Sequence, residues 1–179
     1  MLSLRDYQSR IQVEKAIVAR ELPQFRFSQS ENDCCFIGQH TTSTRHNCYQ
    51  LKLVLGKYYP DEMPKLFVTS PPFLFNYHYT KTISSLGVSH AFHTLRNGPD
   101  GCVQICHFKQ ETWDSSRTCV GALIKGILWC DAYDVHLTTG KDIAEILSRW
   151  ENGRHPRLSD ILQDLEWMHF RGFPRSLFD

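Results

Sequence analysis

An alternation of apolar and polar residues over positions 47–55 constrains the fold of this chain more than any other feature. The side chains on one face are Tyr49, Leu51, Leu53 and Leu55, and those on the other include Gln50 and Lys52. This period of two is typical of a half-buried β-strand. Residues 24–39 suit one strand or a hairpin, and residues 65–69 suit a further strand that ends before two prolines. Consecutive strands of this kind predict an antiparallel meander.

Helical patterns flank these strands. Residues 3–22 predict a helix that Ser3 can cap and Pro23 ends. Its apolar stripe comprises Tyr7, Ile11, Val13, Ala16, Ile17 and Leu22. Asp114-Ser115-Ser116 indicates the start of a second helix with a broad apolar face, which Gly140 closes. Two shorter helices are predicted over residues 142–150 and 159–170.

Composition and charge exclude several classes of protein. With 179 residues, 41% hydrophobic and 22% charged, the chain is long enough for one globular domain with its own core. A net charge of +1 provides no strong field for binding nucleic acid or an anionic membrane. The apolar runs are too short to cross a bilayer, and the N-terminus lacks the pattern of a signal peptide. We therefore expect a cytoplasmic protein.

The seven cysteines are an odd number, so we expect free thiols rather than a disulfide framework. Cys119 and Cys130 lie within a helical pattern, where a free cysteine serves as a small core residue. Cys106 differs from them. It ends the short apolar segment 101–106, follows a long loop rich in aromatic and histidine residues (73–100), and precedes Trp113. A thiol held there by rigid backbone has the position of a covalent acyl carrier.

Several of these segments resemble motifs of the ubiquitin-conjugating enzymes. The run from Tyr59-Pro60 to Pro64-Lys65 is similar to that family's Tyr-Pro…Pro-Lys turn between two meander strands. Ile105-Cys106-His107 is similar to its nucleophile segment, Trp113 to the tryptophan that follows, and Gly98 and Gly101 to the glycines that precede it. The His-Pro-Asn triplet of the family is missing.

The bacterial branch of the family gives the closer match. There a His…Gly…Cys…Trp order precedes a helix with a Trp-x-x-x-Tyr…Thr-Gly pattern, which resembles Trp129, Tyr133 and Thr139-Gly140 here. The resemblance covers residues 1–147. It implies an α+β fold with an N-terminal helix, an antiparallel meander sheet, an active-site loop and C-terminal helices. We assign residues 1–150 to this domain and residues 151–179 to a C-terminal helical extension packed on it.

The resemblance implies a transferase that carries the C-terminal glycine of a donor protein as a cysteine thioester and passes it to a lysine amine. Bacterial relatives of this kind belong to cyclic-oligonucleotide anti-phage signalling operons, where the donor is a cGAS-like nucleotidyltransferase. A ubiquitin-like modifier is an alternative donor. No glycine-rich phosphate loop is present, so an activating enzyme or an already activated donor would have to supply the energy. No cofactor is implied, and no metal.

The resemblance assigns the nucleophile to Cys106. His93 is the candidate neighbour of the thiol, and Asn97 is the candidate amide donor to the tetrahedral oxyanion. Cys102 is an alternative nucleophile because it follows Gly101 directly, although it lies farther from Trp113 in the sequence.

Two other functions stay open from the sequence. The missing triplet favours a catalytically silent scaffold of the same fold. His90-x-x-His93 and Cys102-x-x-x-Cys106 offer two imidazoles and two thiols, which could bind zinc in an interaction domain.

Overall fold

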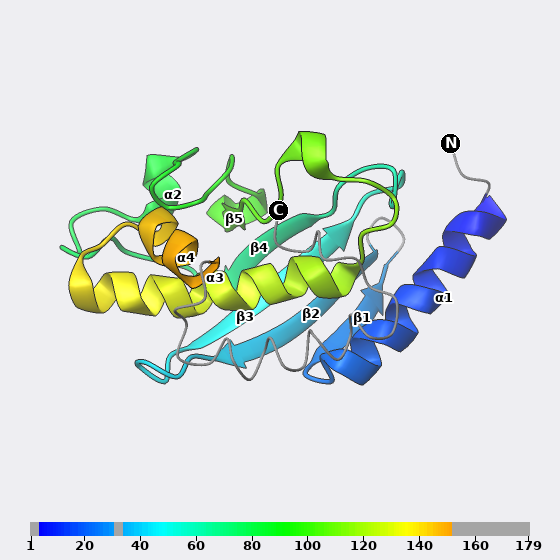
Figure 1. Cartoon of the computed structure of the whole chain (residues 1–179), viewed down its shortest axis with the longest axis horizontal. Helices are drawn as coiled ribbons and strands as arrows, with labels where there is room; N and C mark the ends of the chain where they lie inside the picture. The colour runs from blue at the N-terminus through cyan, green and yellow to red at the C-terminus, as the bar shows by residue number, and fades with distance from the viewer. Residues whose placement is uncertain (1–3, 31–33, 152–179) are drawn as a thin grey trace.

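The computed structural model describes residues 4–30 and 34–151. Three predictions therefore lie outside the described residues: the cap Ser3, the helix over residues 159–170, and all but the first residue of the extension 151–179. The described part is an α+β structure in which an antiparallel sheet is flanked by an N-terminal helix and C-terminal helices (Figure 1). Among the helices of the described residues, none is both long and apolar enough to cross a membrane.

The predicted meander is confirmed. The strands are β1 (Phe25–Gln29), β2 (Cys34–Thr41), β3 (Cys48–Leu55), β4 (Lys65–Ser70) and β5 (Val103–Ile105), hydrogen-bonded in sequence order and all antiparallel. The alternation that predicted β3 places Tyr49, Leu51, Leu53 and Leu55 in the core. Residues 24–39 form the hairpin alternative, because β1 pairs directly with β2.

Helix α1 (Leu4–Glu21) confirms the first predicted helix but corrects its buried face. Ile11, Glu14 and Val18 are buried, whereas Val13 is 52% exposed. The buried positions follow the i, i+3, i+7 spacing of one helix face. A carboxylate thus occupies the middle of the face that packs on the protein.

Helix α3 (Cys119–Thr139) runs across one face of the sheet (Figure 1). Gly126 allows the close approach of the helix to β3 and β4, because a Cβ at this position would lie 2.7 Å from Leu66 Cδ2 and 3.2 Å from Leu51 Cδ1. Beyond α3 lies α4 (Ile143–Glu151), close to the predicted 142–150. The predicted C-cap is also confirmed, because Gly140 is left-handed, with φ 72°, and its N–H donates to His136 O.

The start of α3 lies later than the sequence predicted. The carboxylate of Asp114 accepts a hydrogen bond from the backbone N–H of Ser116 at 2.8 Å, which closes a turn instead of beginning the helix. Thr118 is the N-cap, and its hydroxyl accepts from the N–H of Gly121.

The long loop 73–100 contains the short helix α2 (Ile83–Leu86). Two side chains on one face of α3 hold this loop through hydrogen bonds to its backbone. Trp129 Nε1 donates to Phe92 O at 2.8 Å, and the Tyr133 hydroxyl both donates to Phe75 O and accepts from Phe75 N. The Trp-x-x-x-Tyr pattern therefore fixes the loop that leads toward Cys106.

Candidate functional site

Cys106 lies where the chain leaves β5 and is half-buried. Its N–H donates to His93 O at 2.9 Å, and its Sγ lies 3.8 Å from Phe108 O, the acceptor of a weak thiol hydrogen bond. Burial raises the pKa of the Cys106 thiol, the nearby positive charge of Lys125 opposes this rise, and the negative charge of Glu111 adds to it. The resting group is thus a protonated thiol that keeps partial access to solvent.

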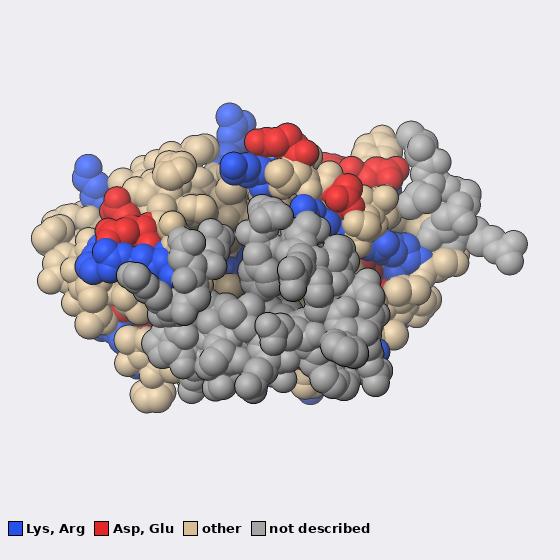
Figure 2. Space-filling model, in the orientation of Figure 1, with Lys and Arg blue, Asp and Glu red and all other residues tan. Residues whose placement is uncertain are grey.

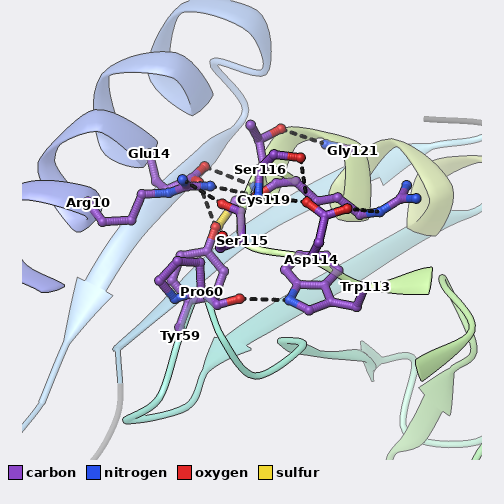
Figure 3. Close-up of polar contacts among 12 residues, drawn as sticks. Arg10, Glu14, Tyr59, Pro60, Trp113, Asp114, Ser115, Ser116, Cys119 and Gly121 are labelled. Atoms are coloured by element: carbon purple, nitrogen blue, oxygen red, sulfur yellow. Dashed lines mark hydrogen bonds and ion pairs between the residues drawn. The ribbon is translucent and has the colours of Figure 1, made fainter. Parts of the chain in front are cut away.

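The loop after Cys106 is anchored to the turn between β3 and β4. Trp113 Nε1 donates to Pro60 O at 2.8 Å, as Figure 3 shows, and its ring lies 6.3 Å from that of Tyr59 and 5.5 Å from that of Phe108. Trp113 and Trp129 are both buried in the core. Two motifs fifty residues apart in the sequence therefore meet beside the candidate nucleophile.

His93 lies directly across from Cys106. Thr94 pairs with Ile105 in an antiparallel bridge, and this register places the preceding residue opposite Cys106. His93 itself has a left-handed backbone with φ 49°, and its ring lies 5.7 Å from that of His90. The backbones of His93 and Cys106 are therefore neighbours, as predicted.

Asn97 and Cys102 lie at the other end of β5. Gly98 N donates to Cys102 O at 2.9 Å, which closes the turn that leads into the strand. Because a strand rises roughly 3.3 Å per residue, Cys102 and Cys106 stand about 13 Å apart. The Asn97 amide donates to Ser84 O at 2.6 Å, so it anchors the loop to α2. This geometry does not support the predicted oxyanion role of Asn97.

The four residues of the zinc alternative are divided between the two ends of β5. Across residues 4–30 and 34–151, no group of three or more His, Cys, Asp or Glu side chains is placed to hold a metal ion. Cys119 and Cys130 are fully buried, as predicted, and burial raises both thiol pKa values well above the ordinary range.

Charged side chains of both signs lie on the described surface, and two cations lie over Phe108. On the described part of the face in Figure 2, lysines and arginines alternate with acidic residues and do not form a patch of one sign. Next to the thiol, the Nζ of Lys125 on α3 lies 4.2 Å from the centre of the Phe108 ring, and the Arg117 guanidinium lies 4.8 Å from it. Sequence reasoning missed Lys125, because only the packing of α3 across the sheet brings its side chain to Phe108.

His107 follows the candidate nucleophile in the sequence and faces the interior. It is 4% exposed, its Nδ1 lies 3.4 Å from Ile105 O, and its Nε2 has no hydrogen-bond partner within the described residues. Burial is the main cause that lowers its pKa from 6.5 to about 4, and the charge of Lys125 lowers it further. The folded protein therefore holds this imidazole neutral down to acidic pH.

We expect the stability of the protein to fall between pH 6.5 and 4 for this reason. The unfolded chain gains a proton on His107 over this window and the folded chain does not, so the free energy of unfolding decreases as pH falls. At 1.36 kcal/mol per pKa unit the loss is at most about 3 kcal/mol. Urea unfolding across this range measures it. The variant His107→Leu should have a flatter profile, and identical profiles for the two proteins would contradict the prediction.

No known protein family, curated protein or solved structure matches this chain.

Proposed function

We propose that this protein is an acyl carrier of the ubiquitin-conjugating type, in which Cys106 holds a donor's C-terminal glycine as a thioester and passes it to a lysine. The observation that carries the proposal is the position of Cys106. It is a half-buried thiol at the end of the last meander strand, beside a loop that Trp113 pins to the Tyr59-Pro60 turn. The order of helix, meander, loop and crossing helix supports a fold of that family.

The chemistry follows from the thiol. Cys106 loses its proton, and the thiolate attacks the carbonyl carbon of an activated glycyl donor and displaces the activating group. The lysine nitrogen then attacks the same carbon and forms an amide bond, the C–S bond breaks, and the nitrogen releases its extra proton to solvent. Because burial raises the thiol pKa, Cys106 should load slowly on its own and depend on a donor that brings its own activation.

The donor and partner remain those that the resemblance implies: a protein ending in glycine, either a cGAS-like nucleotidyltransferase or a ubiquitin-like modifier, and an activating enzyme. Anti-phage defence in the bacterial cytoplasm is the corresponding biological role. The scaffold alternative makes a different prediction from the acyl-carrier proposal. In a scaffold, an acyl group on Cys106 is no more reactive toward lysine than one on any other thiol.

A peptide thioester that ends in glycine and carries a mercaptoethanesulfonate leaving group tests this difference without the natural donor. The peptide can acylate Cys106 and also the exposed Cys48, which serves as the internal control. Excess lysine is then added, and peptide mapping by mass spectrometry follows each adduct. We expect the Cys106 adduct to pass to lysine at least about 10²-fold faster, the range of positioned acid–base or electrostatic catalysis. Equal rates would favour the scaffold.

A further inference from the structure

A lysine and the candidate nucleophile share one neighbour. The Phe108 ring lies 4.2 Å from Lys125 Nζ, and the carbonyl oxygen of the same residue accepts from Cys106 Sγ at 3.8 Å. The positive charge of Lys125 acts on both Cys106 and His107. It opposes the rise that burial causes in the thiol pKa, and it adds to the lowering of the imidazole pKa. The ammonium group is therefore held close to the short segment that contains the thiol.

Two amide groups that could serve an oxyanion at this place already have acceptors. The Cys106 N–H donates to His93 O, and the Asn97 amide donates to Ser84 O toward the far end of β5. Attack of an amine on a thioester places a negative charge on the carbonyl oxygen, and a preorganised positive group stabilises this charge most where water is partly excluded. Half-burial of Cys106 provides such a setting.

The other charged groups nearby do not suit this role. Glu111 is negative and exposed, and its effect on the thiol is opposite to that of Lys125. Arg117 also lies over the Phe108 ring, but its Nε donates to Thr112 O at 2.8 Å and its side chain is only 9% exposed. Arg117 is thus committed to holding the loop, whereas Lys125 is half-buried on α3 and is the cation whose charge acts on the thiol.

We infer that Lys125 is a catalytic residue that stabilises the oxyanion of the acyl group on Cys106. This inference rests on the proposed function. As the amine nitrogen forms its bond to the thioester carbon, the π electrons of the C=O bond move to oxygen, where the Lys125 ammonium faces them. When the C=O bond reforms, the C–S bond breaks, Cys106 leaves as a thiolate, and the nitrogen's extra proton goes to solvent.

The test uses the full chain loaded at Cys106 with the same peptide thioester, followed by discharge to lysine between pH 7 and 10. Lys125→Met removes the charge and keeps the length of the side chain, and Lys125→Arg keeps the charge. Lys15→Met is the matched control, because Lys15 is also half-buried and also lies over an aromatic ring, 4.9 Å from the centre of Phe27. Each rate is measured on the mapped Cys106 adduct, so incomplete loading does not affect it.

We expect Lys125→Met to slow discharge by about 10²–10³-fold at every pH, the usual effect of losing one oxyanion donor. Lys125→Arg should recover most of the rate, and Lys15→Met should match the parent protein. Lys125→Met could instead change the pH dependence of Cys106 alkylation and loading while the discharge rate stays within about threefold of the parent protein. Lys125 would then affect only the pKa of the thiol, and the inference would be wrong. If the parent protein's Cys106 adduct discharges no faster than its Cys48 adduct, the proposed function fails and the inference fails with it.

Discussion

Cys106→Ala is expected to lower peptide transfer to lysine by at least about 10³-fold, because it removes the nucleophile on which both chemical steps depend. Cys106→Ser should instead retain the acyl group as an oxyester that reductant does not cleave. The side chain at this position is half-buried, and a small residue replaces it in both variants, so we expect the fold to be kept. Chromatographic detection of the lysine conjugate measures the loss.

Cys102→Ala is the matched control for this prediction. Cys102 is half-buried like Cys106 and flanks the same strand, but it lies in the turn at the opposite end, where its carbonyl accepts from Gly98 N. Transfer by Cys102→Ala should stay within a few-fold of the parent protein. The reverse outcome, in which Cys102→Ala abolishes transfer and Cys106→Ala does not, would assign the nucleophile to Cys102.

Glu14→Ala is expected to have the largest effect on stability. Glu14 is fully buried, and Figure 3 shows that its carboxylate connects α1 to the start of α3. Its Oε1 accepts from the Arg10 guanidinium at 2.8 Å and from the Tyr59 hydroxyl at 2.5 Å, and its Oε2 accepts from the N–H of Cys119 at 2.9 Å. The variant leaves a buried hydroxyl and a helix N–H without an acceptor, and leaves the guanidinium without its counter-charge.

Breaking a buried ion pair from one side costs about 3–5 kcal/mol, so Glu14→Ala should lower the free energy of unfolding by that amount. For a chain of this size the melting temperature would fall by about 10 °C. Glu145→Ala is the control, because Glu145 also pairs with an arginine four residues away, Arg149, but both side chains are about half exposed. That variant should cost less than about 1 kcal/mol. Similar losses for the two variants would show that the Glu14 carboxylate contributes little.

The buried face of α1 shows where periodicity alone misleads. The apolar residues of this helix are spread widely enough that several faces fit a 3.6-residue period, and the predicted stripe included Val13, which is 52% exposed. The correct face contains Glu14, which a rule based on hydrophobicity places outside. The sequence feature that could have indicated the buried glutamate is its position on the same helix face as Ile11 and Val18. Its partners come from residues 59 and 119, so no local pattern predicts that this charge is satisfied.

The sequence by itself determined the first helix, the strands β3 and β4, the end of α3 and the order in which they follow one another. Alternation over residues 47–55 and the capping glycine at 140 are local properties, and each set the structure that the chain adopts there. Cys106 could be singled out in the same way, because its distance from the helix and from Trp113 is a matter of spacing along the chain.

Only the tertiary structure decided which side chains surround that thiol. The pairing of residues 94–95 with β5 placed His93 beside Cys106, while Asn97, four residues later, went to the far end with Cys102. The crossing of α3 over the sheet brought Lys125 to Phe108. These neighbours depend on strand register and on the approach of α3 at Gly126, both set by packing between distant segments. A local sequence pattern specifies neither the strand register nor the orientation of α3. The same sequence with its register shifted by one residue, or with the helix rotated, would give the thiol different neighbours.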